Sequence, residues 1–540
     1  MTAPRTRYYS AQLQSPIFRL PREVRDVIYE YYLLEQDGYH YDSEMGKLLY
    51  QNPSITPKQV VRIGLRITCR IAAEEMKNIA FRKIQFYPKP SDDDGGEYMK
   101  VRSRAGRFRC LLKYVERQKC RMLVCAAELL QTEDFTDIYN RYPSVEYWFR
   151  VPLRRAIARQ TDELSPSTDE DVRSQAFSDA LQHALVLAKN RHPSKFAKLV
   201  SPTFGLGDCP IGSVGLGMVQ NNLFVEGALS DIYHWHPAPW CMPSEQELSR
   251  LEALICQPGN SDTCLPITKD GIFYYEDIRD HFDAAKSRWY FSAAAVAIDF
   301  LHRLPKERRC NLRSIVLNED VKAVSRSECH ARGLITFCLE NSSLLVKRHI
   351  GLLTNLLPVE SSEISADRHA CIFTEDCFEA LVPWIEDALL LPSHGMPEQS
   401  FQLLVDGVAR ESKEFWHMLK YAAATQEARQ RQVLLSGIPL PPRITPPDYH
   451  NIYTVFSFPV DFAQSIRDIA QENSLVRYNG DAGELWDLDT FCFETRNWTL
   501  EQWESDWNEK INLVIASRFW LYVWDRYDID TTGAPGSRNA

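Results

Sequence analysis

Residues 288–304, RWYFSAAAVAIDFLHRL, begin the stretch of sequence that most clearly indicates the fold. Their apolar side chains recur with the spacing of one helical face and include Phe291, Ala294, Ile298 and Leu301. The apolar run at 312–317 then predicts a strand, residues 327–340 predict a helix, and residues 344–348 predict a second strand. A strand, a helix and a strand joined by short loops predict a parallel strand pair with a right-handed crossover.

Helix-then-strand patterns of the same kind occur on both sides of this unit, at 172–200 and 379–406. The spacing between strands, about thirty residues, is compatible with a leucine-rich-repeat-like arrangement, although the Leu-x-x-Leu-x-Leu-x-x-Asn signature is missing. We therefore expect an α+β, helix-rich fold whose body, residues 107–435, is an irregular α/β domain.

A short amphipathic helix is predicted near the N-terminus, where residues 18–33 read FRLPREVRDVIYEYYL. Pro21 suits the first helical position, because the missing N–H has no partner there and the fixed φ fits a helix. Charged residues occupy one face of this helix. The other face is apolar and consists of Leu20, Val24, Val27, Ile28 and Tyr31.

Further elements are predicted directly after this helix. Residues 37–50 alternate aromatic or apolar side chains around a polar, glycine-containing turn, which is typical of a β-hairpin. A long helix is predicted from about Pro57 to Phe81, and a strand is predicted at 84–86.

The motif Leu20-Pro21-Arg22-Glu23 and the later Thr68-Cys69-Arg70 resemble the first and the closing helix of an F-box. More narrowly, residues 16–90 look like the degenerate, F-box-like N-termini of a group of uncharacterised fungal proteins. The hairpin is an insertion relative to an ordinary F-box. This resemblance implies that the module docks onto the adaptor of an SCF-type ubiquitin ligase. The implied partner-binding residues are Leu20, Pro21, Val24, Val27, Ile28 and Tyr31.

Two stretches of the body extend this resemblance. Leu317-Asn318-Glu319-Asp320 and the later residues 328–334, ECHARGL, are similar to a stretch of the same fungal proteins. The resemblance assigns no chemistry to either of them.

Bulk composition limits the function classes. With 540 residues, the chain should form two to four domains, and 44% hydrophobic and 25% charged residues are ordinary globular values. The net charge of −10 argues against wholesale binding of nucleic acid or anionic membranes. The apolar run at 293–298 is too short to span a bilayer, and the first sixteen residues do not resemble a signal peptide.

Cysteine usage favours an intracellular protein. The fourteen cysteines form no Cys-x-x-Cys pair, and several fall inside helical patterns, so we expect them to be reduced and mostly buried. The expected localisation is cytoplasmic or nuclear.

The C-terminal segment, 449–528, is expected to pack on the body and to end in a Trp-rich helix from Leu500 to about Trp524. Thr499 and Gln502 predict a capping box at its start. Its apolar face consists of Trp503, Trp507, Ile511 and Val514. Segments expected to be linkers or disordered are 1–15, 88–106, 162–171, 436–448 and 529–540.

Two local patterns were considered as sites of chemistry. The glycine-rich residues 205–217 begin like a dinucleotide fingerprint, but Pro210 replaces the third glycine and the lysine of a phosphate loop is missing. His234 and His236 would share one face of a strand, with Cys241 nearby, yet four metal ligands cannot be assembled. A surface loop and aromatic packing are the favoured interpretations, so no cofactor and no metal are expected.

The basic run at 102–121 could meet an acidic partner or nucleic acid, but it is more typical of a solvated helix face. The chain has no Gly-x-Ser-x-Gly elbow, no His-Glu-x-x-His pair and no kinase-like motif set. We therefore predict no catalytic residues.

The favoured hypothesis is a non-catalytic substrate receptor that holds an SCF adaptor with its N-terminal helices and an unknown target protein with its body. A structural or scaffolding protein, with the F-box-like segment absorbed into its core, is the alternative. An enzyme using 205–217 or His234 and His236 is third. Exposure separates the first two, because a docking helix must present Leu20, Val24 and their neighbours to solvent.

Overall fold

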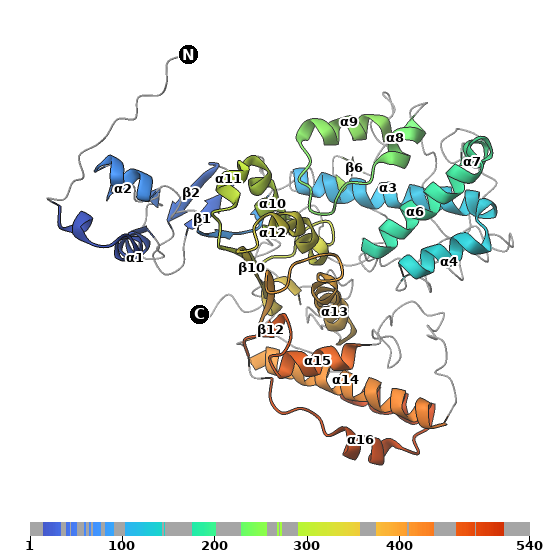
Figure 1. The fold of residues 1–540 in the computed structure, drawn as a ribbon. Coiled ribbons are helices and arrows are strands. Elements are labelled where there is room, and N and C mark those ends of the chain that lie inside the picture. The colour runs from blue at the N-terminus through green and yellow to red at the C-terminus, as the bar shows by residue number, and fades with distance from the viewer. Residues whose placement is uncertain are drawn as a thin grey trace, which may run out of the picture.

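The computed structural model describes a helix-rich protein with a mixed sheet, which confirms the α+β part of the predicted fold class (Figure 1). The described residues are 15–33, 39–43, 45–50, 59–60, 64–65, 68–76, 82–90, 103–142, 145, 175–200, 228–255, 267–268, 271–272, 290–356, 374–407, 410–436, 461–480 and 482–511.

An eight-stranded mixed sheet organises the molecule, with the strand order β12-β11-β10-β9-β4-β1-β2-β3. The six strands from β12 to β1 in this order are all parallel to their neighbours. Strand β2 pairs antiparallel with β1, and β3 pairs antiparallel with β2. The strands are β1 (Tyr39–Asp42), β2 (Lys47–Tyr50), β3 (Gln59–Val60), β4 (Lys83–Phe86), β9 (Ser314–Glu319), β10 (Leu345–Gly351), β11 (Phe401–Asp406) and β12 (Val476–Tyr478).

The predicted strand-helix-strand unit is present. Strand β9 leads through the 3₁₀ helix η10 (Ser327–Leu334) and helix α12 (Ile335–Glu340) into β10, which lies parallel to it. Helix α10 (Ala293–Arg303) precedes the unit, and its N-terminus is capped by Ser292. These elements bury the apolar side chains of one sheet face, among them Ile315, Leu317, Val346 and Ile350.

The same arrangement continues along the chain. Helix α13 (Thr374–Leu390) leads to β11, as the pattern at 379–406 predicted. Helices α14 (Arg410–Ser436) and α15 (Phe462–Ala470) then precede β12. Because each crossover returns the chain to the same end of the sheet, consecutive strands become parallel neighbours.

A lobe of helices with a core of its own lies to one side of the sheet (Figure 1). Its helices are α3 (Arg104–Ala126), η4 (Ala127–Leu129), α4 (Thr132–Arg141), α6 (Gln175–Arg191), α7 (Pro193–Val200), α8 (Ala228–His234) and α9 (Glu245–Ile255). The strand predicted within 172–200 is therefore wrong, because Phe196 and Val200 are spaced to bury one face of a second helix.

Two short strand pairs complete the described sheets. Strand β5 (Lys89–Pro90) pairs with β8 (Tyr290–Phe291), and β6 (Ile267–Thr268) pairs with β7 (Gly271–Ile272). Since α3 begins at Arg104, both ends of the segment 88–106, expected as a linker, lie in regular elements.

The N-terminal region contains η1 (Pro16–Arg19), α1 (Arg22–Leu33) and α2 (Arg70–Glu75). The predicted hairpin is confirmed as β1 and β2, with Gly46 at a φ of +63° in the turn between them. The long helix predicted from Pro57 is wrong: Gln59–Val60 forms the edge strand β3, which pairs with β2, and Cys69 is extended at φ −157°. Helix α2 therefore begins only at Arg70.

The sheet joins the N-terminal strands to the body. Strand β4 lies between β1 and β9, so that Lys83 is in register with Ser314. The hairpin thereby extends the sheet of the body, while α1 and α2 lie beyond its edge (Figure 1).

Near the C-terminus, the structure describes α16 (Leu488–Thr495) and α17 (Leu500–Ile511). The predicted capping box is present: the Thr499 N–H donates to Gln502 Oε1 at 2.8 Å, and the Gln502 N–H donates to Thr499 Oγ1 at 3.3 Å. Trp503 and Trp507 are buried, and the Trp507 ring lies 6.2 Å from that of Phe378. The rest of the expected Trp-rich helix, from 512, lies outside the described residues.

Several other expectations also fall outside the described part of the chain, namely those for 162–171, 205–217, 437–448 and 529–540. Among the described helices, none combines the length and the apolar composition that a membrane crossing requires.

Candidate functional site

Helices α1 and α2 are joined by one carboxylate, Glu75 at the end of α2. Its oxygens accept hydrogen bonds from Arg25 Nε at 3.0 Å and Arg25 Nη2 at 2.5 Å. The Tyr29 hydroxyl donates to the same carboxylate at 2.7 Å, and Arg22 Nη1 lies 3.0 Å from it. The Tyr29 ring is fully buried beside Ala72 and Met76 of the second helix.

These contacts shift the pKa values of Glu75 and Tyr29. Burial alone raises the pKa of the Glu75 carboxyl, but hydrogen bonds from Arg25 and Tyr29 outweigh it and lower the pKa from 4.5 to about 2. Burial and the bond to Glu75 raise the pKa of Tyr29 from 10.0 to about 12. At neutral pH, Glu75 is therefore a carboxylate and Tyr29 a neutral donor.

The contacts of Glu75 with Arg22, Arg25 and Tyr29, which we name the Glu75 clamp, decide which side of α1 faces α2. A surface helix ordinarily turns its apolar side to the core and its charged side to water. Here the charged side, with Arg22 and Arg25, faces α2, and the apolar side faces outward. The exposed fractions are 37% for Leu20, 43% for Val24, 50% for Val27 and 81% for Tyr31, while Ile28 is half-buried and Pro21 is exposed.

We name this surface the α1 patch and define it by Leu20, Val24, Val27 and Tyr31. The structure brings together on it most of the residues that the F-box resemblance suggested. The polar contacts that turn it outward could not be found from the sequence, because Arg25 and Glu75 are fifty positions apart.

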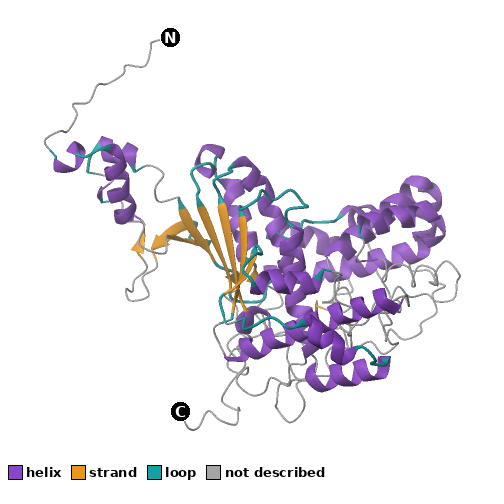
Figure 2. Cartoon of the chain, turned by 60° about the horizontal axis from the view of Figure 1, so that its bottom comes forward, coloured by secondary structure: helices purple, strands orange, loops and turns teal. Residues whose placement is uncertain are grey.

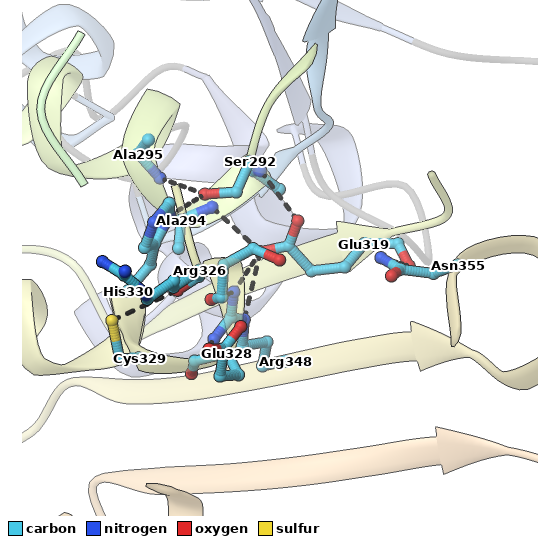
Figure 3. A network of polar contacts seen from close by, with 12 residues as sticks. Ser292, Ala294, Ala295, Glu319, Arg326, Glu328, Cys329, His330, Arg348 and Asn355 are labelled. Carbon is cyan, nitrogen blue, oxygen red and sulfur yellow. Dashed lines mark hydrogen bonds and ion pairs between the residues drawn. The ribbon is translucent and has the colours of Figure 1, made fainter. Parts of the chain in front are cut away.

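A second arrangement is a buried polar network between the sheet and the helices α10 and η10 (Figure 3). The Arg348 guanidinium donates to Glu319 Oε1 at 2.8 and 3.0 Å, and both side chains are at most 1% exposed. Glu319 also accepts the backbone N–H groups of Ala293 and Ala294, at 2.9 and 3.2 Å, and so caps α10. Arg348 reaches the carbonyls of Ser327 and Glu328 as well.

The network also includes a serine–histidine pair (Figure 3). The Ser292 hydroxyl donates to His330 Nδ1 at 2.6 Å, because Nε2 carries the proton that it donates to the Ser325 carbonyl at 2.8 Å. Burial, together with the charge of Arg348, lowers the pKa of His330 to about 3, so the imidazole is neutral.

This pair has the residue types of a nucleophile and a base, but its surroundings give it a structural role. Ser292 is 0% exposed and His330 is 1% exposed, which leaves a substrate no approach. The Ser292 oxygen also accepts the Ala295 N–H and thereby caps α10. The stretches 317–320 and 328–334, singled out in the sequence, thus meet in a network that joins α10, β9, η10 and β10.

The two histidines considered for metal binding do not share a face. His234 is the last residue of α8, and its Nδ1 lies 2.6 Å from the Ser230 carbonyl oxygen. His236 Nε2 lies 3.1 Å from Asp179 Oδ1. The strand assumed for these residues is wrong because a helix ends between them. Within the described residues, no group of three His, Cys, Asp or Glu side chains is placed to hold a metal ion.

The basic run lies on α3 and partly faces the lobe interior. Arg107 donates to the Glu252 carboxylate at 2.7 and 2.8 Å and pairs with Glu245. Lys119 donates to Gln182 Oε1 at 2.6 Å, and burial lowers the pKa of its ammonium to about 8. The interpretation as a solvated helix face is therefore wrong for Lys119, which is buried in the lobe, whereas Arg107 is partly exposed and pairs with two glutamates of α9.

No protein-family model, no curated protein and no solved structure matches this chain.

Proposed function

We propose that this protein is a non-catalytic receptor whose α1 patch docks onto a partner protein, in the manner of an F-box helix on an SCF-type adaptor. The observation that carries the proposal is the outward-facing apolar stripe of Leu20, Val24, Val27 and Tyr31. An amphipathic helix with anchors at such spacing fits a hydrophobic groove of a partner.

The energetics favour a covered patch. Fully burying an exposed valine or leucine side chain is worth about 1.5–3 kcal/mol, and docking would remove the exposed parts of Leu20, Val24 and Val27 from water. The Glu75 clamp holds α1 in place before binding, which lowers the entropy lost on docking. The identity of the partner as an SCF adaptor rests on the Leu20-Pro21-Arg22-Glu23 resemblance.

Exposure favours this proposal over the scaffolding alternative. In a helix absorbed into the core, Val24 and Val27 would be buried, as Tyr29 is on the opposite side. Their exposed fractions of 43% and 50% are instead those expected of a surface that awaits a partner.

Co-purification with a recombinant SCF adaptor tests the proposal. We expect wild-type protein to retain the adaptor and Val24→Asp with Val27→Asp to weaken binding at least 100-fold, because two desolvated anchors become charged. Leu434→Asp with Leu435→Asp is the matched control, since both leucines are 82% exposed on α14. A wild-type chain that retains no adaptor, or a patch variant that binds as well as the control, would overturn the proposal.

A further inference from the structure

The α1 patch has two edges of different chemistry. Along one edge, acidic side chains recur at i, i+3 and i+7, the spacing of one helical face, and we name them the acidic ridge: Glu23, Asp26 and Glu30. Glu23 lies one helical turn before Val27, and Glu30 lies one turn after it. Because residues one turn apart are neighbours on a helix surface, the acidic ridge borders the patch.

The opposite edge of the patch is apolar. Ile28 lies one turn from Val24 and is half-buried, and Tyr32 is 36% exposed. The Tyr32 hydroxyl accepts the Leu65 N–H at 3.1 Å, so its polar atom already has a partner within the chain. A protein that covers the α1 patch therefore meets carboxylates on one side and apolar groups on the other.

The carboxylates of the acidic ridge are accessible and only partly neutralised by the contacts of the described residues. Glu23 is exposed, and the side chains of Asp26 and Glu30 are 31% and 37% exposed. Arg22 Nε lies 2.8 Å from Asp26 Oδ1, and Arg82 pairs with Glu30. Since Arg22 also pairs with Glu75, its charge is shared between two carboxylates. In these contacts, negative charge exceeds positive charge along the ridge.

The position of α1 in the molecule leaves room for a second protein. The helices nearest to the N-terminus lie apart from the main group of described helices (Figure 2). The groove of a partner that receives α1 must place one wall against each edge of the patch. A wall of lysine and arginine is attracted to the acidic ridge, whereas an acidic wall is repelled.

The same charges disfavour a bilayer as the occupant. Amphipathic helices that lie on anionic membranes carry many lysines and arginines on their polar face. In α1, Arg22 and Arg25 are bound to Glu75 on α2, and the ridge beside the patch is acidic.

We propose that the α1 patch fits a protein groove with one apolar wall and one basic wall, and that lysines or arginines of the basic wall pair with Glu23 and Glu30. This inference rests on the receptor function proposed above, because it describes the partner at the same contact. It also fixes which way round α1 lies in the groove.

Surface plasmon resonance with the full chain and an immobilised recombinant SCF adaptor tests the inference. We expect association of the wild type to slow as salt is raised, because salt screens the attraction. Glu23→Lys should weaken binding about tenfold and remove most of this salt dependence, and Glu23→Gln should weaken binding about threefold. Glu74→Lys is the matched control, since Glu74 is an exposed glutamate of α2 outside the ridge.

The salt dependence separates pairing across the interface from a role in folding. Glu23 lies in the first turn of α1, where a negative charge also stabilises the helix. Loss of that effect would lower the stability of α1, which circular dichroism during heating detects, but would leave the salt dependence of association unchanged.

Three results would overturn the inference. If Glu23→Lys binds the adaptor as the wild type and Glu74→Lys do, the basic wall is wrong and the receptor function stands. If the wild type retains no adaptor, both proposals fail together. If vesicles of anionic phospholipid bind the wild type but not the Val24→Asp, Val27→Asp protein, the patch faces a membrane instead of a protein groove.

Discussion

The α1–α2 end and the centre of the body are both held by an arginine–glutamate pair, yet the two pairs have different surroundings. Arg348 and Glu319 are at most 1% exposed, and each makes further hydrogen bonds to backbone groups. Arg25 and Glu75 are 15% and 10% exposed and lie at the rim of a small helical pair. The same chemistry thus supports the core in one region and orients a surface helix in the other.

The contacts of Glu75 show how a surface helix can be held with its apolar side facing outward. Around Glu75, the buried apolar cluster among the described residues is small and consists of Tyr29, Ala72 and Met76. Arginine contacts replace the apolar packing that would otherwise hide the outer stripe of α1. In the body, by contrast, the ion pair is itself buried, and the strands that carry it also contribute to the large apolar core.

The largest effect is expected in the body. Glu319→Gln leaves the Arg348 charge buried without a full counter-charge, and we expect the body to lose about 3–5 kcal/mol of unfolding free energy. Urea unfolding followed by circular dichroism measures this change. Glu340→Gln is the control, because its pair with Arg309 is partly exposed and should contribute about 1 kcal/mol or less. Similar losses in both variants would show that burial does not set the contribution of the Arg348–Glu319 pair.

A smaller, local effect is expected at the other pair. Glu75→Gln should lower the free energy of opening α1 by about 1–2 kcal/mol, because two arginines lose their carboxylate. Amide hydrogen exchange, resolved by peptide, should accelerate over residues 22–33 and stay unchanged over β9 and β10. Tyr29→Phe removes one hydrogen bond from the same cluster and should have about half the effect. Acceleration spread over the whole chain would show that the two regions unfold together.

Acidification should reproduce the local effect. Because the folded pKa of Glu75 is lowered to about 2, its stabilisation is fully present above pH 4.5 and is lost as the pH falls towards 2. Solvent screening at the rim limits the loss to about 1–2 kcal/mol. Hydrogen exchange of α1, corrected for intrinsic rates, should show this pH dependence in wild type. The Glu75→Gln protein should lack it, and an identical dependence there would assign the effect to another group.

Local signals in the sequence predicted many elements of the fold. The stripe of α10, the capping box at Thr499 and the hairpin around Gly46 all depend on residues a few positions apart, whose preferences need no distant partner. The parallel pair of β9 and β10 followed from the short crossover between them.

Two predictions from the sequence are wrong because the pattern of neighbouring residues did not decide the local structure. In place of the helix expected from Pro57, residues 59–60 form β3, because β2 offers them a pairing partner in which Val60 lies opposite Leu49. The single face assumed for His234 and His236 was lost at the end of α8.

By itself, the sequence determined that α1 is an amphipathic helix with an apolar stripe from Leu20 to Tyr31, since that depends only on spacing along the chain. Only the tertiary structure decided that the stripe faces outward, because Glu75 on α2 draws Arg25 and Tyr29 inward. It also decided that Arg348 meets Glu319, since strand register sets which side chains share a face. The spacing of apolar residues is a property of one segment. The direction in which the apolar side faces depends on a contact with another segment of the folded chain.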